Sequence, residues 1–584
     1  MDSRLTVAAL LLTAWIAPAA DPPPPLGSKV ADFTLPEPST GKKWSLADNA
    51  RDAKAVVIVF TSTACPVCNG YVPRLAEIAK KHAGDKVTWV GIASHPADDS
   101  DTVAKHVRAA ELPFPLLKDD GTALAEKLRI ERVPTVLVLD AGRTVRYAGR
   151  IDDQLSPGVQ KAKASTAELA DALAAVLKGE EVKIPHAASA GCKLTNTKAV
   201  VKADTPVTYQ KHVAAILQTK CQDCHRPGEA GPFPLTTYQQ AKSWSAMLRE
   251  VVADGVMPPW HADAPPGHFK NDRRLSAGEK KTLLAWVDQG CPEGDAKDAP
   301  PPRKFADGWR LGREPDEVLS MDRASKVPAS GAMPYEYHIV GKPFAEDKWV
   351  TAVEVRPEQR AVVHHVIAYM LPPGKTMLDL LSPDFGQYML GAYVPGDQPV
   401  IGGPGQARKI PKGSKIIFEV HYTPNGKAVT DKSSIGLCYT KQPPETELYC
   451  VSVMNGRFRI PPGADNHEVK SEHKFEKATT LLSVTPHMHV RGKAFKYEVV
   501  TPDGKRETIL NVPKYDFNWQ ATYDFAKPVE MPAGAKLECT AWYDNSARNP
   551  FNPDPKKTVR WGDMTNDEMM IGFALYHDTK EAKK

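Results

Sequence analysis

The stretch KAVVIVFTSTACPVCNGYVPRLAEIAKKH, residues 54–82, determines the fold expected for the first third of the chain. It opens with a short apolar run, which is typical of a buried strand. A helix is expected to follow at once, and the alternation continues downstream. The expected strands are 54–61, 87–93, 135–140 and 145–149. The expected helices are 65–82, 101–110 and a last one that a capping box at 165–168 opens and that runs to 177. Strands that alternate with helices predict an α/β layered domain, which we place at residues 25–185.

Two cysteines of that stretch, Cys65 and Cys68, form a CPVC motif between the strand and the helix. This placement is expected of a thiol redox motif. Because a helix N-terminus stabilises an anion, we expect Cys65 to be the nucleophile and Cys68 to be the resolving cysteine. A structural disulfide or a metal-binding pair is the alternative.

The flanking residues resemble those of thioredoxins, and most of all the redoxin branch that is related to peroxiredoxins. The resemblance rests on FTSTACPVCNGYVPRLAEIA, on Val133-Pro134-Thr135 before a strand, and on the ending RYAGRIDDQ. It implies a cis proline at Pro134 beside the thiol pair. It also implies that Ser62 fills the place of the Thr or Ser three residues before a peroxidatic cysteine. A reductase, a peroxidase and an electron relay all stay open.

A second motif, CQDCH, is the attachment signature of c-type haem. Cys221 and Cys224 would form thioethers to one haem c, and His225 would be its proximal ligand. Helices are expected at 208–220 and after a capping box at 276–279, so we expect an all-α cytochrome c domain at residues 205–297. A zinc site or a disulfide is the alternative.

The sixth position of such a haem calls for a further ligand. Met257 lies in the proline-rich loop GVMPPWHAD and is our first candidate, with His261 as the runner-up. Met247 lies inside an expected helix and is expected to belong to the core. Met/His ligation raises the reduction potential, which suits electron transfer.

The last third of the chain contains six potential copper ligands. They are His364, His365, His421, His487, His489 and Met569. Imidazole suits Cu(II) and thioether sulfur suits Cu(I), so a site that holds both can keep copper through a redox cycle. The HMH pair fits one face of a strand, because residues i and i+2 point to the same side. The adjacent pair His364-His365 can share a metal only where the strand bulges.

The order and flanks of these ligands resemble the copper type II, ascorbate-dependent monooxygenases, the peptidylglycine and dopamine hydroxylase family. The resemblance implies two copper ions: an electron-storing site of His364, His365 and His421, and an oxygen-activating site of His487, His489 and Met569. It also implies tandem jelly-roll-like β-sandwiches, which we place at residues 320–442 and 443–584. Many short strands separated by turn signals agree with that architecture.

Two positions depart from the peptide-amidating members of that family. Their substrate-holding Arg and Tyr correspond here to Thr485 and Phe573. A peptide that ends in glycine is therefore a doubtful substrate.

The N-terminus and the composition bear on location and partners. Residues 1–20 combine Arg4, a short apolar run and small residues before Asp21, which is the pattern of a secretory signal peptide. We expect a periplasmic or secreted protein without a transmembrane segment. The net charge of +5 is small for 584 residues, so nucleic acid is not an expected partner. The pairing of the remaining cysteines cannot be deduced from the sequence; they are Cys192, Cys291, Cys438, Cys450 and Cys539.

Together these motifs predict a multidomain, copper-dependent monooxygenase-like oxidoreductase that hydroxylates a small substrate with O₂. Electrons would come through the haem and possibly the thiol domain, from an external electron donor or thiol reductant. Two alternatives remain: a non-catalytic electron-transfer or copper-handling protein, and a thiol-disulfide oxidoreductase or peroxidase with accessory haem and copper domains.

Overall fold

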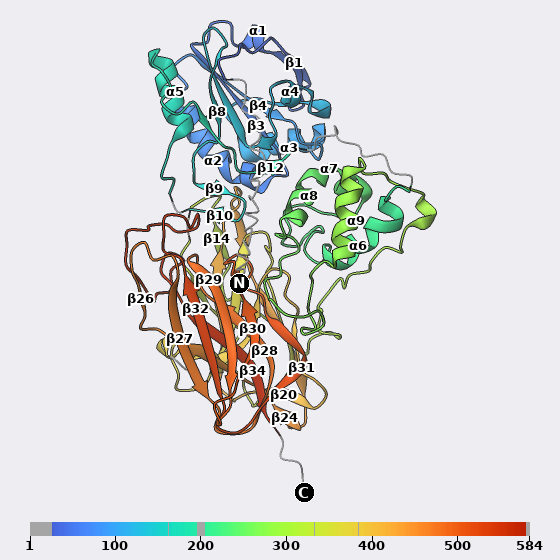
Figure 1. The fold of residues 1–584 in the computed structure, drawn as a ribbon, viewed down its shortest axis with the longest axis vertical. Coiled ribbons are helices and arrows are strands. Elements are labelled where there is room, and N and C mark those ends of the chain that lie inside the picture. Colours follow the sequence, from blue (N-terminus) through green and yellow to red (C-terminus); the bar gives the residue numbers. More distant parts are fainter. Residues whose placement is uncertain (1–25, 162, 195–204, 332, 383–384, 580–584) are drawn as a thin grey trace, which may run out of the picture.

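The computed structural model describes residues 26–161, 163–194, 205–331, 333–382 and 385–579. Figure 1 shows an α/β unit at the top, a cluster of short helices beside it and a β-rich region below. The expected signal peptide lies outside the described residues. No helix in the described part of the chain is long and apolar enough to cross a membrane.

The first unit is a six-stranded sheet in the order β11-β8-β7-β3-β4-β5, with parallel and antiparallel neighbours. Its strands are β3 (Ala55–Thr61), β4 (Val87–Ala93), β5 (Leu116–Lys118), β7 (Thr135–Asp140), β8 (Val145–Gly149) and β11 (His186–Ala187). Strand β3 is buried along nearly its whole length, as its apolar sequence predicts. The unit has the expected thioredoxin-like fold.

The helices of this unit are α1 (Leu46–Asn49), α2 (Pro66–Lys81), α3 (Ser100–Ala110), α4 (Ala123–Lys127) and α5 (Glu168–Lys178). Helices α2 and α3 follow the expected ranges closely, whereas α1 and α4 were not expected. The capping box expected to open α5 is not formed, because the N-cap residue is Ala167, which makes no side-chain cap bond. Helix α2 has Pro66 in its first turn, which suits a helix start. The Val133–Pro134 peptide bond is cis, as the resemblance implies.

Residues 205–297 contain short helices and loops. The helices are η2 (Tyr209–Val213), α6 (Ala214–Lys220), α7 (Tyr238–Ser243), α8 (Ser245–Ala253) and α9 (Ala277–Asp288). The expected capping box of α9 is present, with Ser276 and Glu279 bonding reciprocally.

This segment is not the separate all-α cytochrome c-like domain that the sequence predicted. Its helices share one apolar core with the α/β unit. Its loop around Trp260 and Phe269 leaves the helices and packs in the core of the C-terminal sandwich, where Phe269 bridges to Phe525. Apolar residues in a loop pack wherever a core accepts them, so the segment joins its two neighbours.

The first β-sandwich follows. One sheet has the order β13-β23-β16-β20-β24, with β13 at Glu317–Ser320 and β24 at Thr446–Glu447, and the facing sheet has the order β15-β21-β17-β18. Its main strands are β15 (Glu336–Val340), β16 (Lys348–Arg356), β17 (Val363–Leu371), β18 (Met389–Tyr393), β20 (Gln406–Ile410), β21 (Lys415–Tyr422) and β23 (Ser434–Thr440). Side chains of both sheets meet in one core, as in a sandwich.

The second β-sandwich has sheets β25-β34-β28-β31 and β27-β32-β29-β30. The strands are β25 (Tyr449–Met454), β27 (His467–Lys474), β28 (Thr479–His487), β29 (Gly492–Val500), β30 (Arg506–Val512), β31 (Tyr523–Met531), β32 (Lys536–Tyr543) and β34 (Ile571–Asp578). An apolar cluster joins the two sandwiches, with Tyr369 of β17 and Phe573 of β34 among its members. Because successive residues of β17 point to opposite faces, one face fills its own core and the other faces the second sandwich.

Candidate functional site

The first histidine group lies on that second face of β17 and on β21. His365 is directly opposite His421 in the strand register, and the pairing shifts between Val363 and His365. The bulge brings His364 beside its neighbour, with the two Nδ1 atoms 3.1 Å apart. This is the irregularity that adjacent histidine ligands require. One ligand atom from each of the three histidines lies within 4.8 Å of the others, so the group can hold a metal ion.

The chemistry of these rings fits a metal better than a hydrogen-bond network. Buried ring nitrogens without a hydrogen-bond partner occur on His364 (Nε2), His365 (Nε2) and His421 (Nδ1). A buried polar atom without a partner is costly, and coordination to a metal would satisfy each of these. Burial lowers the pKa of His421 to about 3, so the imidazole stays neutral, which is the form that binds copper.

The second histidine group begins where β28 ends. His487 is the last residue of that strand and His489 lies just beyond it, with ring centroids 5.4 Å apart. His487 Nδ1 donates to Gln520 Oε1 at 2.6 Å, which leaves Nε2 available for a metal. His489 Nδ1 donates to the Asp567 carbonyl at 3.3 Å, and its buried Nε2 has no partner. The HMH pair therefore presents two free Nε2 atoms from a strand end rather than from a continuous strand.

The two groups meet across the interface between the sandwiches. The ring centroids of His365 and His487 are 6.1 Å apart. Tyr335 lies between the groups, 4.7 Å from His421 and 6.4 Å from His489 by ring centroids. The sequence predicted one copper site in each sandwich, whereas the structure places the five imidazoles in one continuous cluster.

Met569 lies two residues before strand β34, which belongs to the second sandwich. It is half-buried against the apolar cluster between the sandwiches, whereas Met570 is fully buried in the core. Two residues further on, Ile571 pairs with His487 in the sheet. Met569 is thus the more accessible methionine at the end of the loop that leads to the second histidine group.

Several residues that the sequence analysis missed hold the second group in place. The buried carboxylate of Glu568 accepts the backbone N–H groups of His489 (2.9 Å) and Arg491 (2.6 Å). Burial raises the pKa of Glu568 to about 8. Arg491 is itself buried and donates to Asn545 and Asn552. These asparagines belong to the stretch YDNSARNPFN, so its polar composition serves to fix the turn after the HMH pair.

Two aromatic residues complete the cluster. Phe517 stacks on His364 at 4.7 Å between ring centroids. The hydroxyl of Tyr335 is buried without a hydrogen-bond partner, and burial raises its pKa well above the usual value. Neither residue stands in a pattern that marks it from sequence alone. The two positions that depart from the peptide-amidating enzymes make ordinary contacts: the half-buried Thr485 donates to Thr522, and the buried Phe573 packs on Phe385.

The CQDCH motif follows helix α6. Cys221 and Cys224 are unpaired, and His225 Nδ1 donates to the Phe233 carbonyl at 3.0 Å. That bond orients the ring and frees Nε2 for a metal. Met257 and Met247 line the same cavity as His225. His261 has a buried Nε2 without a hydrogen-bond partner and is not among the residues that line this cavity. The residues present therefore fit a haem, which His225 and Met257 would hold.

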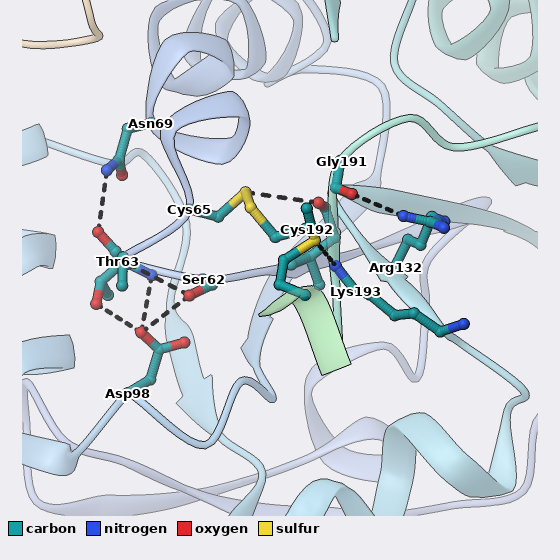
Figure 2. Close-up of a disulfide and its surroundings, with 12 residues drawn as sticks. Ser62, Thr63, Cys65, Asn69, Asp98, Arg132, Gly191, Cys192 and Lys193 are labelled. Carbon is teal, nitrogen blue, oxygen red and sulfur yellow. Dashed lines mark hydrogen bonds between the residues drawn. A yellow bond between two sulfur atoms is a disulfide. The ribbon is translucent and has the colours of Figure 1, made fainter. Parts of the chain in front are cut away.

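The thiol site differs from the expectation. Cys65 is bonded to Cys192, with the two Cα atoms 6.1 Å apart (Figure 2). Cys68 is a free buried thiol. Cys68 is therefore not the partner of Cys65, and burial raises its pKa to about 12. The serine expected to assist Cys65, Ser62, donates to the buried Asp98, which also accepts from Thr63.

One large cavity connects these sites. It measures about 1650 Å³ and extends from the α/β unit past the CQDCH motif to the first histidine group. Cys192, Cys224, His225, His364 and His421 all contribute to its wall. The thiol site, the CQDCH motif and the first histidine group thus open onto a common space.

Comparisons with known proteins identify two parts of the chain. Residues 26–148 match the AhpC/TSA family, and residues 448–584 match the C-terminal domain of the copper type II ascorbate-dependent monooxygenases. Neither match extends over the helical segment. A search of curated proteins finds no match.

Solved structures resemble the first unit. A hypothetical protein from Sinorhizobium meliloti 1021 is 32% identical to this chain. The match covers 30% of this chain and 95% of that protein, with a TM-score of 0.28. A peroxidoxin from Mycobacterium tuberculosis is 22% identical over 26% of this chain and 94% of its own, with a TM-score of 0.21. A secreted disulfide oxidoreductase from the same organism is 24% identical over 24% of this chain and 95% of its own, with a TM-score of 0.20.

Proposed function

Given a chain that carries a redoxin domain and a copper monooxygenase C-terminal domain, both of oxidoreductase type, we propose an exported enzyme that hydroxylates a small substrate with O₂. Two copper ions bind at the histidine cluster, and one haem c binds at the CQDCH motif. The observation that carries this proposal is the meeting of two histidine groups with unpartnered ring nitrogens, the first of which reaches the wall of a large cavity through His364 and His421.

The protein residues position the two metal sites in different ways. His364, His365 and His421 offer imidazoles alone, which suits a site that stores an electron. His487, His489 and Met569 would form the second site, where a thioether favours the reduced metal. Bound copper would supply oxygen activation and hydrogen abstraction. Gln520 orients the imidazole of His487, Glu568 fixes the backbone at His489 and Arg491, and the neighbouring Tyr335 and Phe517 keep the cluster apolar.

The electron supply to copper is built into the chain. The CQDCH motif docks against the first sandwich: Cys224 Sγ is so close to Gly396 that a Cβ there would lie 3.3 Å away. Two ion pairs fasten the contact, Arg273 to Asp397 at 3.7 Å and Arg360 to Glu229. A haem at this place faces the same cavity as His364. Fusion on one chain gives such a donor a high effective concentration.

The substrate class follows from what the second site lacks. With Thr485 and Phe573 at the two departing positions, no cation from these positions is available for a substrate carboxylate. The cavity wall combines apolar side chains such as Phe517 and Met333 with the charged side chains of Lys427 and Asp516. We therefore expect a small substrate that is not held through a carboxylate at the two departing positions.

The experiment loads the exported protein with copper, reduces the haem and follows oxygen uptake and product formation with a panel of small substrates. Met569→Ile should abolish substrate-dependent oxygen uptake while haem and the three-histidine site remain filled. Met377→Ile, at an exposed methionine, is the matched control. Metal binding without any oxygen uptake would instead indicate an electron-transfer or copper-handling protein.

A further inference from the structure

The Cys65–Cys192 bond joins residues that are 127 positions apart in the sequence. A two-residue strand, β12 (Cys192–Lys193), pairs with β6 (Arg132–Val133) and places Cys192 directly opposite Val133. Gly191 is packed so closely on the Val133 carbonyl that a side chain there would collide with it. Arg132 Nη1 also donates to the Gly191 carbonyl at 3.1 Å. The segment is thus seated beside the cis proline, with its cysteine against Cys65 (Figure 2).

The other cysteine of the CPVC motif has the opposite character. Cys68 lies on the buried side of α2 and is almost fully inaccessible. In the buried interior the neutral thiol is favoured, and a thiol is a far poorer nucleophile than a thiolate. Cys68 is therefore unsuited to attack an oxidised Cys65.

The two sulfurs of the bond differ in a way that favours its reduction. Cys65 is the N-cap residue of the sixteen-residue helix α2, where the helix dipole stabilises a thiolate. A stabilised thiolate is the better leaving group in thiol–disulfide exchange. Cys192 lines the cavity, whereas Cys65 is fully buried and is not part of the cavity wall. An incoming thiolate therefore reaches the sulfur of Cys192 and releases the anion at Cys65.

We propose that Cys192 is the second redox residue of the thiol site, and that it resolves a Cys65 oxidised by a hydroperoxide. The Cys65 thiolate attacks the O–O bond, which yields a sulfenic acid on Cys65 and releases an alcohol, or water from hydrogen peroxide. The Cys192 thiol then attacks the Cys65 sulfur, forming the disulfide and releasing water. One equivalent of a dithiol, entering through the cavity, attacks Cys192, restores both thiols and leaves as a disulfide.

This activity is independent of the proposed hydroxylation, because it uses neither the haem nor the histidine cluster. The short strand β12 makes it mechanically feasible. Within the described residues, β12 pairs with a single strand over only two residues, and Leu194 N–H donates to the Glu131 carbonyl at 2.8 Å. A strand of two residues can separate by local opening, which would let Cys192 leave and return during the cycle.

The test uses the exported full-length protein. The protein is reduced with dithiothreitol, freed of reductant and treated with one equivalent of hydrogen peroxide. Peptide mapping after alkylation should then find the Cys65–Cys192 crosslink. In Cys192→Ser the crosslink should be lost, and dimedone should trap a persistent sulfenic acid on Cys65. Cys68→Ala and the control Cys438→Ala should form the crosslink as wild type does.

Three results would overturn the proposal. One is a Cys65–Cys68 crosslink in the wild-type protein. Another is a sulfenic acid that persists on wild-type Cys65 while Cys192 stays reduced. The third is a Cys65–Cys192 bond that dithiothreitol fails to reduce in the folded protein, which would make it a structural crosslink. The wild-type measurements decide these points even if the Cys192 variant folds poorly.

Discussion

The imidazole of His365 in the first sandwich lies 6.1 Å, between ring centroids, from that of His487 in the second. The two histidine groups are thus neighbours across the interface rather than separate sites in separate domains. Only the contact between the sandwiches brings them together, because each group belongs to a different sheet. Any change that separates the sandwiches should therefore affect both groups.

Copper binding should reflect this arrangement. We expect two copper ions per chain, and in the Cu(II) form we expect their spins to interact in electron paramagnetic resonance spectra. His365→Ala removes one of the three imidazoles of the first site, which should then lose its copper. The ligands of the second site are unchanged, so about one ion per chain should remain. His467→Ala, outside the cluster, should leave two. Metal analysis after dialysis measures this, and two retained ions in His365→Ala would contradict the assignment.

Gln520 should matter for copper affinity without touching the metal. Its carbonyl oxygen accepts from His487 Nδ1 and so keeps Nε2 directed at the site. Replacing such an outer partner typically costs about 10- to 100-fold in metal affinity. We expect Gln520→Leu to weaken the second site by this factor, and Gln520→Glu, which keeps an acceptor, to weaken it much less. Competition with a chelator gives the affinities, and equal losses in both variants would indicate a general structural effect instead.

The haem ligands can be tested by spectroscopy. Cys221→Ala combined with Cys224→Ala should abolish covalent haem staining in the exported protein. Met257→Ala should remove the low-spin Met/His spectrum, because Met257 lines the cavity beside His225. The matched variant His261→Ala should retain it, since His261 does not line that cavity. A low-spin spectrum that survives in Met257→Ala and disappears in His261→Ala would reverse the choice of ligand.

Cys68 should be inert at neutral pH and reactive only in strong alkali. In the reduced, folded protein, alkylation at pH 8 should label Cys65 and Cys192 and spare Cys68, whose pKa burial raises to about 12. The ordinary thiol pKa is 9.0, so the folded state keeps a proton that the unfolded state loses above about pH 9. This thiol therefore stabilises the fold at neutral pH, and that contribution declines as the pH rises through 9 towards 12. In Cys68→Ala the alkaline loss of stability should be smaller, as thermal unfolding between pH 8 and pH 11 would measure.

The sequence predicted those parts of the structure that depend on local patterns. The buried strand β3, the helix after CPVC and the capping box at Ser276 all follow from nearby residues. The bulge at His364 was a condition that adjacent ligands impose, and it is present. By contrast, the Cys65–Cys192 bond depends on a chain path of 127 residues, which no local pattern encodes. The same holds for the loop around Phe269, which packs into the core of the C-terminal sandwich and bridges to Phe525.

The sequence gives little sign of the residues that support the site. Glu568 precedes Met569 directly, so its place beside a ligand motif was a usable signal. Tyr335 is one aromatic residue in an unremarkable stretch, and only the folded interface places it between two histidine groups. When contacts between distant segments set the position of a side chain, no local sequence pattern predicts that position.

The central claim is that electrons from the haem reach oxygen through the histidine cluster. Its most direct test is a single-turnover measurement, in which the fully reduced, copper-loaded protein is mixed with oxygen and haem reoxidation is followed by absorbance. We expect fast reoxidation in the copper-loaded wild-type protein, and reoxidation slowed at least about tenfold in His421→Ala, which corresponds to about 1.4 kcal/mol in the barrier. If His421→Ala and the copper-free wild-type protein both reoxidise as fast as the copper-loaded wild type, electrons do not pass through the histidine cluster.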